Sequence, residues 1–300
     1  MSKYIKSFNS AAELISYYNT AEGKKYYTLM NTAGEEGIGT SITSGKKIIS
    51  AYKSKYDYLT FTAVEAGAIV RYNNLTNTTA EYSTDGGLTW NNGVNVNVTL
   101  TNIGDSVKYR GVISGNLSID ISTRRFYMSK KISASGSIMS MYNNNPDDTE
   151  IVYKSAFANM FYGCTSLTTA PELPATTIIN SCYNGMFNGC TNLTTAPELP
   201  ATSLFDYCYG GMFRGCTSLT TAPELPATNL VNSCYTCMFE NCSSLTSVTH
   251  HITNWNTSNT GNWLNGVAAT GTVKCPANST IPSDSTSGIP TGWTRENLWF

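Results

Sequence analysis

Seven of the nine cysteines recur at a fixed spacing, and a cysteine can bind metal, form a disulfide or act as a nucleophile. They form two series with a step of 26 residues: Cys164, Cys190, Cys216 and Cys242, and Cys182, Cys208 and Cys234. Equivalent residues of stacked repeats lie about 5 Å apart, but their side chains point in parallel, whereas a disulfide needs them to converge. We therefore predict free, buried thiols that pack as small apolar groups, with redox or metal-binding roles as alternatives.

Glutamate and tyrosine side chains follow the same step. The glutamates are Glu172, Glu198 and Glu224, and the tyrosines are Tyr183, Tyr209 and Tyr235. A row of carboxylates could bind Ca²⁺, but each glutamate lies between prolines on an expected turn, so we favour solvated carboxylates. The tyrosines could pack in the core or offer rings and hydroxyls to a sugar or protein. With Trp255 and Trp263 they are the candidate binding residues.

Enzymatic chemistry has little support in the sequence. His250 and His251 are the only histidines and are adjacent, so a histidine-based triad has few ways to assemble. A glycosidase needs two carboxylates at a defined separation, and no acidic pair is marked by its context. We predict no catalytic residues, no metal site and no cofactor, with a glycan-active enzyme as a minor alternative.

Composition excludes some partners. Only 13% of the residues are charged and the net charge is −1, so we expect no nucleic-acid partner. No run of about 18 apolar residues occurs, so we expect no membrane insertion. The N-terminus shows no secretory signal, which predicts that the chain is cytosolic when made; a mature secreted form that has lost its signal is the alternative.

A 26-residue repeat must position most of these side chains. Its register is marked by Met160, Met186, Met212 and Met238, each followed by Phe. A period of this length predicts a solenoid in which each coil buries its apolar face against its neighbours, so Met186 and Phe187 are expected in the core. The apolar spacing within 181–190 predicts one short helix per coil, and the segment Leu193–Ala196 predicts a strand.

The rest of the chain has a different pattern. Eight β-branched and aromatic runs separated by turn residues predict an antiparallel, Ig-like sandwich: Tyr58–Ala63, Ala68–Tyr72, Ala80–Ser83, Val94–Thr101, Ser106–Ile113, Leu117–Ile121, Arg125–Lys130 and Ser137–Met141. The fold class is thus mostly β with short helices, in four segments: an N-terminal anchoring or oligomerisation region (1–56), the sandwich (57–145), the repeats (146–247) and a C-terminal cap (248–300).

The segment Ser83–Trp90, which reads STDGGLTW, resembles the Asp-box hairpin of sialidases and other β-proteins. The resemblance implies that Asp85 sets the turn and that Trp90 packs beneath it. Both residues are therefore predicted to be structural and not catalytic.

The repeat phrase, which reads MFNGCTNLTTAPELPAT from Met186, resembles the BspA-like leucine-rich repeat of bacterial surface and phage-encoded proteins. The likeness extends over 151–294, and the sandwich resembles the Ig-like module that accompanies such repeats. It implies adhesion through protein or glycan contacts and no catalytic residues.

The resemblance leaves two locations open. The first is a phage virion surface, as a head fibre or tail-associated adhesin made in the host cytoplasm. Residues 1–56 would then bind other virion proteins, the repeats would contact a host surface glycan or protein, and the chain would form a homo-oligomer, with a trimer as our guess. The second is the surface of a bacterial cell. Because no signal or lipidation cysteine follows Met1, we favour the virion.

Overall fold

The computed structural model of the chain describes residues 57–74, 78–117 and 124–298, together with the backbone of four strands nearer the N-terminus. The protein is mostly β-structure. Among the described residues the only helices are α2 (Ser140–Asn143) and the 3₁₀ turn η2 (Thr257–Asn259). The chain forms two compact units, Met1–Asp57 and Tyr58–Phe300.

The first unit is an antiparallel sheet with the order β1-β4-β2, in which β3 also pairs with β4. Its strands are β1 (Lys3–Ile5), β2 (Tyr27–Leu29), β3 (Thr40–Thr43) and β4 (Lys46–Lys53). The side chains of residues 1–56 lie outside the described part of the chain, so the anchoring role stays a prediction.

The second unit begins with two sheets that face each other. One contains β12 (Ile132–Ser135), β5 (Leu59–Ala63), β10 (Ser106–Ile113), β7 (Thr78–Ser83) and β8 (Asn91–Asn92), in that order. The other contains β11 (Arg124–Met128), β6 (Ala68–Asn74) and β9 (Val98–Leu100). Aromatic rings join them, since Phe61 on β5 lies 4.8 Å from Phe126 on β11 between ring centroids.

The structure corrects one of the eight predicted runs and leaves another largely undescribed. Strands are present in six of the eight runs, whereas Ser137–Met141 is not a strand. Gly136 has a φ of 74°, which ends β12, and Ser137 then begins a turn by accepting a hydrogen bond from Ser140 N. The run Leu117–Ile121 lies outside the described residues beyond Leu117.

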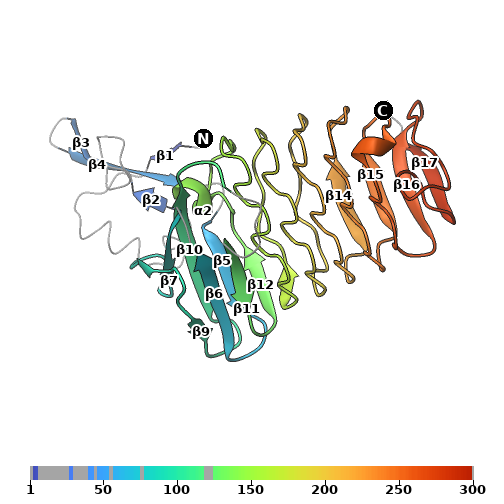
Figure 1. The fold of residues 1–300 in the computed structure, drawn as a ribbon. Coiled ribbons are helices and arrows are strands. Elements are labelled where there is room, and N and C mark those ends of the chain that lie inside the picture. Colours follow the sequence, from blue (N-terminus) through green and yellow to red (C-terminus); the bar gives the residue numbers. More distant parts are fainter. Residues whose placement is uncertain are drawn as a thin grey trace. The chain divides into compact units, whose positions relative to one another are not determined.

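A β-solenoid of about three turns follows the two facing sheets and shares their core. Its first strand, β13 (Leu167–Thr169), pairs in parallel with β12. The stack of phenylalanine rings that runs through the coils also begins in the sheets, because Phe126 lies 5.4 Å from Phe161 with nearly parallel rings. The strands at 57–145 therefore cover the first coil, and segments 57–145 and 146–247 belong to one unit (Figure 1).

The prediction of one short helix per coil is wrong. Residues 181–190 form successive turns, in which every fourth residue has a positive φ: Ser181 (57°), Gly185 (60°) and Gly189 (77°). The backbone N–H groups of this segment alternate between two kinds of acceptor. One half donate within the coil and close turns, as Cys182 N donates to Ile179 O. The other half donate to the next coil, as Tyr183 N donates to Cys208 O. The four-residue apolar spacing that resembles a helical face therefore comes from a four-residue turn.

The C-terminal segment continues the solenoid with shorter coils. The strands β14 (Thr221–Leu225), β15 (Ser247–His250), β16 (Gly271–Pro276) and β17 (Trp293–Leu298) form a parallel sheet in that order. The paired positions shift from Thr221↔Ser247 to Ser247↔Thr272 and then Gly271↔Trp293. The coil thus shortens towards the C-terminus, where Figure 1 shows these strands side by side.

Candidate functional site

The cysteine series lie in the core, as predicted. All nine cysteines are free, and only Cys237 is partly exposed. Each member of the first series donates its thiol hydrogen to a phenylalanine carbonyl of the preceding layer, for example Cys190 Sγ to Phe161 O at 3.1 Å and Cys216 Sγ to Phe187 O at 3.2 Å. Burial disfavours the thiolate and raises the pKa of Cys164 to about 12. These groups therefore stabilise the stack and are poor nucleophiles.

This burial predicts the outcome of a thiol titration. At pH 8 the folded protein is expected to react slowly with Ellman's reagent, with Cys237 reacting first, because the raised pKa of the buried thiols leaves almost no thiolate. After unfolding in reductant-free denaturant, all nine thiols should react. Rapid labelling of several thiols in the folded state, or a lower final count, would contradict the packing described above.

The tyrosine column (Tyr183, Tyr209 and Tyr235) also lies inside the solenoid. Each residue is 1% exposed, and neighbouring rings stack at 5.8 and 6.1 Å between centroids. Burial raises the pKa of all three phenols well above the usual value. The column therefore lacks the exposed ring face that the binding hypothesis requires.

The two candidate tryptophans hold the C-terminal segment in place. Trp255 Nε1 donates to Ser287 O and Trp263 Nε1 donates to Gly288 O, both at 2.7 Å. Trp263 is fully buried, and its indole lies 4.8 Å from that of Trp255. These bonds assign both side chains a packing role, since each indole has its single donor occupied.

Asp85 and Trp90 build a hairpin. The Asp85 carboxylate accepts hydrogen bonds from the Ser83 hydroxyl, from the backbone N–H groups of Leu88 and Thr89, and from the Thr89 hydroxyl. These hydrogen bonds stabilise the charged carboxylate and hold the pKa of Asp85 well below its usual range. The bond from the Ser83 hydroxyl has the largest effect. The Asp85 carboxylate therefore closes the turn of the hairpin through these hydrogen bonds.

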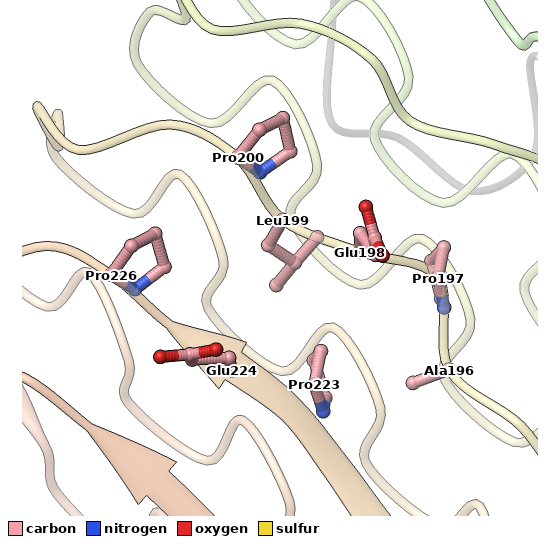
Figure 2. Close-up of a pocket in the computed structure, with 8 residues that line it drawn as sticks. All are labelled: Ala196, Pro197, Glu198, Leu199, Pro200, Pro223, Glu224 and Pro226. Carbon is pink, nitrogen blue, oxygen red and sulfur yellow. The ribbon is translucent and has the colours of Figure 1, made fainter.

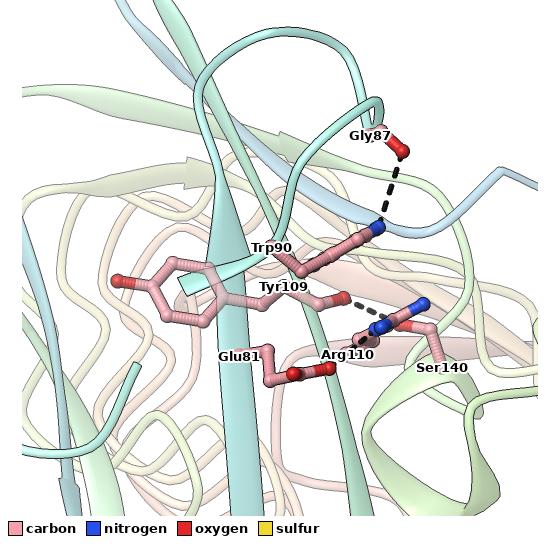
Figure 3. Close-up of polar contacts among 6 residues, drawn as sticks. All are labelled: Glu81, Gly87, Trp90, Tyr109, Arg110 and Ser140. Carbon is pink, nitrogen blue, oxygen red and sulfur yellow. Dashed lines mark hydrogen bonds and ion pairs between the residues drawn. The ribbon is translucent and has the colours of Figure 1, made fainter. Parts of the chain in front are cut away.

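Trp90 ties the same hairpin to the neighbouring strands (Figure 3). Its Nε1 donates to Gly87 O at 3.1 Å, and the Arg110 guanidinium lies 4.2 Å above its ring centroid. Arg110 also pairs with Glu81 at 2.7 Å, across β10 and β7. The Arg110 guanidinium is thus held between the Glu81 carboxylate and the face of the Trp90 ring. These two contacts attach the hairpin to β7 and β10.

The candidate site is a groove between successive coils on the proline-rich edge of the solenoid. It has a volume of about 390 Å³ and is formed by two equivalent segments, Ala196–Pro200 of one coil and Pro223–Pro226 of the next. Figure 2 shows the pyrrolidine rings and the Glu198 and Glu224 side chains around this space. We call it the proline–glutamate groove.

The chemistry of the groove suits binding. Proline rings give it rigid apolar walls, and exposed Glu198 and Glu224 give it negative charge at its surface. The next position along the edge is occupied by His251, whose Nε2 lies 2.5 Å from Glu224 Oε1. Among the described residues, no group of three or more His, Cys, Asp or Glu side chains is arranged to hold a metal ion.

Sequence reasoning found the exposed glutamates but missed the groove. Glu172, Glu198 and Glu224 are exposed, as the solvated interpretation predicts. The groove arises because the same proline-flanked segment is repeated in adjacent coils, so the repeat itself was the signal that could have revealed it.

Among the described residues, no helix has the length and apolar character needed to span a bilayer. Searches of protein-family models, curated proteins and solved structures found no match to this chain.

Proposed function

We propose that the chain is a non-enzymatic structural and adhesion protein whose solenoid contacts a host surface. The observation that carries the proposal is the proline–glutamate groove, which identical segments of adjacent coils create at the surface. The repeated cysteine, tyrosine and phenylalanine side chains are buried, so they are used to stack the coils. The repeated groups that remain exposed include Glu198 and Glu224 of the proline-rich edge, which offers a rigid, periodic face for a partner.

Two features of the fold support membership of the BspA-like leucine-rich-repeat family with an Ig-like module. The Phe161, Phe187, Phe213 and Phe239 rings stack at a step of 26 residues, which is the period of the repeat phrase. Two antiparallel sheets precede them and face each other through Phe61 and Phe126. The family and the module are our assignment, and adhesion is what the family implies.

We place the protein on a phage virion, as a head fibre or a tail-associated adhesin. In this proposal the first unit binds other virion proteins, the solenoid contacts a glycan or protein of the host surface, and the chain assembles as a homotrimer. The alternative location is the surface of a bacterial cell, where the solenoid would make the same contacts. Finding the chain either in phage particles or in bacterial envelopes distinguishes the two locations.

Retention of the purified full chain on intact host bacteria tests the adhesive role. We expect the protein to sediment with the cells, and we expect the double variant Glu198→Lys and Glu224→Lys to be retained several-fold less, because the charge of the groove is reversed. Glu65→Lys, which changes an exposed carboxylate of the sandwich, is the matched control and should be retained like the unmodified chain. Failure of the unmodified protein to bind would contradict the proposal.

A further inference from the structure

One coil of the solenoid departs from its neighbours in several surface residues at once. Where the adjacent coils carry Ile179 and Val231, this coil carries Phe205; where they carry Ser181 and Ser233, it carries Tyr207; where they carry Asn184 and Thr236, it carries Gly210; and where they carry Asn188 and Glu240, it carries Arg214. The core positions between them are unchanged, with Cys208, Met212 and Phe213 fully buried. The differences are therefore confined to the surface of the turns.

Three of these substituted positions, Tyr207, Gly210 and Arg214, line a hollow of about 230 Å³ on the turn-bearing face, which we call the turn-face notch. Gly210 and Gly211, which have no side chains, form its floor, and Thr236 and Cys237 of the next coil also line it. A Cβ atom at Gly211 would meet nothing within 4 Å. Tyr207, Asn184, Asn188 and Arg214 stand around this floor.

Packing does not explain the aromatic side chain at the notch, because Tyr207 is 46% exposed. Tyr207 also has a φ of 57°, a left-handed conformation that is uncommon for a bulky residue and that the other coils give to serine. Backbone strain of this kind is concentrated at functional sites. A role at the surface accounts for the tyrosine.

The polar groups indicate the chemistry of the ligand. The Arg214 guanidinium is paired with Glu240 at 2.7 Å, so the notch carries no surplus positive charge for an anion. The amides of Asn184 and Asn188 can both donate and accept hydrogen bonds, which suits hydroxyl groups. The exposed ring of Tyr207 suits the apolar face of a ring-shaped ligand.

We propose that the turn-face notch binds one neutral saccharide ring. Its volume is below the roughly 300–1,000 Å³ of pockets for larger ligands, so a single ring is the appropriate size. The ring would lie against Tyr207, with its hydroxyls hydrogen-bonded to the two asparagine amides and to Arg214. The inference rests on the proposed adhesive function, because it names the chemical class that the solenoid recognises, but it concerns a different face from the proline–glutamate groove.

Saturation-transfer NMR of the full chain with glucose, galactose, mannose and N-acetylglucosamine tests the inference. We expect signals from the ring protons of at least one sugar. Tyr207→Ser, which installs the serine of the adjacent coils, should remove them. Gly210→Thr should remove them as well, because the new Cβ lies 2.8 Å from Asn184 Nδ2 and the side chain fills the notch.

Tyr127→Ser is the matched control, since Tyr127 is 51% exposed on β11, and it should leave the signals unchanged. Circular dichroism of each variant verifies that the fold is retained. The absence of signal from all four sugars, or equal signals from Tyr207→Ser and the unmodified chain, would overturn the inference. Retention on cells is measured separately with unmodified protein, so an adhesive chain without sugar signals would refute the notch assignment alone.

Discussion

Replacing Phe213 with alanine is expected to lower the free energy of unfolding of the second unit by about 3–5 kcal/mol. Phe213 is fully buried, and its ring stacks between those of Phe187 and Phe239 at 5.6 Å on each side. The coils above and below are held by inter-coil hydrogen bonds such as Phe213 N to Met238 O, so they cannot collapse into the cavity. Urea denaturation followed by circular dichroism measures the loss.

The matched control for this change is Phe205→Ala in the same coil. Phe205 is 41% exposed, so its removal should alter the free energy of unfolding by less than about 0.5 kcal/mol. Similar small effects of the two substitutions would show that the phenylalanine stack does not stabilise the solenoid.

Acidification is expected to destabilise the second unit through His250. The His250 side chain is fully buried beside Trp255, and burial lowers its pKa from 6.5 to about 3, with smaller contributions from His251 and Arg295. The neighbouring histidine, His251, is itself paired with the carboxylate of Glu224. Because the unfolded chain binds the proton more tightly, stability is full above pH 6.5 and falls by about 1.4 kcal/mol per pH unit towards pH 3.

The variant His250→Leu isolates this effect. Leucine occupies the equivalent position of the preceding strand, where Leu225 pairs with His250. Between pH 6.5 and pH 4.5 the unmodified protein should lose about 2.3 kcal/mol more than the variant. Asp85 does not confuse the comparison, because its lowered pKa makes its stability contribution fall only below about pH 4 and it is present in both proteins. Identical pH dependence in both proteins would contradict the assignment.

The sequence was most informative about what repeats. The 26-residue step placed Cys190, Met186 and Phe187 in register with their equivalents, and all three are buried. It was misleading about local conformation, since apolar residues four apart also arise from a four-residue turn with a left-handed residue such as Gly185. Backbone hydrogen bonds to the next coil stabilise that turn, and a local apolar pattern carries no information about them.

The sequence pattern also could not predict the contacts that the repeats make with residues outside them. Phe126 extends the phenylalanine stack from β11, and it accepts a hydrogen bond from Cys164 Sγ at 3.2 Å, although it belongs to no repeat. The tyrosine column was ambiguous because a tyrosine at an inward position is fully buried when its neighbours stack on both faces. The departures at Tyr207 and Gly210 are visible in the sequence, but their convergence on one hollow requires the fold.

Peptide mass spectrometry of purified phage particles tests the central claim most directly. If the chain is an adhesive virion protein, its peptides will co-purify with intact particles, and antibodies against the solenoid will label the particle surface in electron micrographs. Particles that lack these peptides, while surface proteolysis of uninfected bacteria releases them, would contradict the virion assignment and place the chain on the cell.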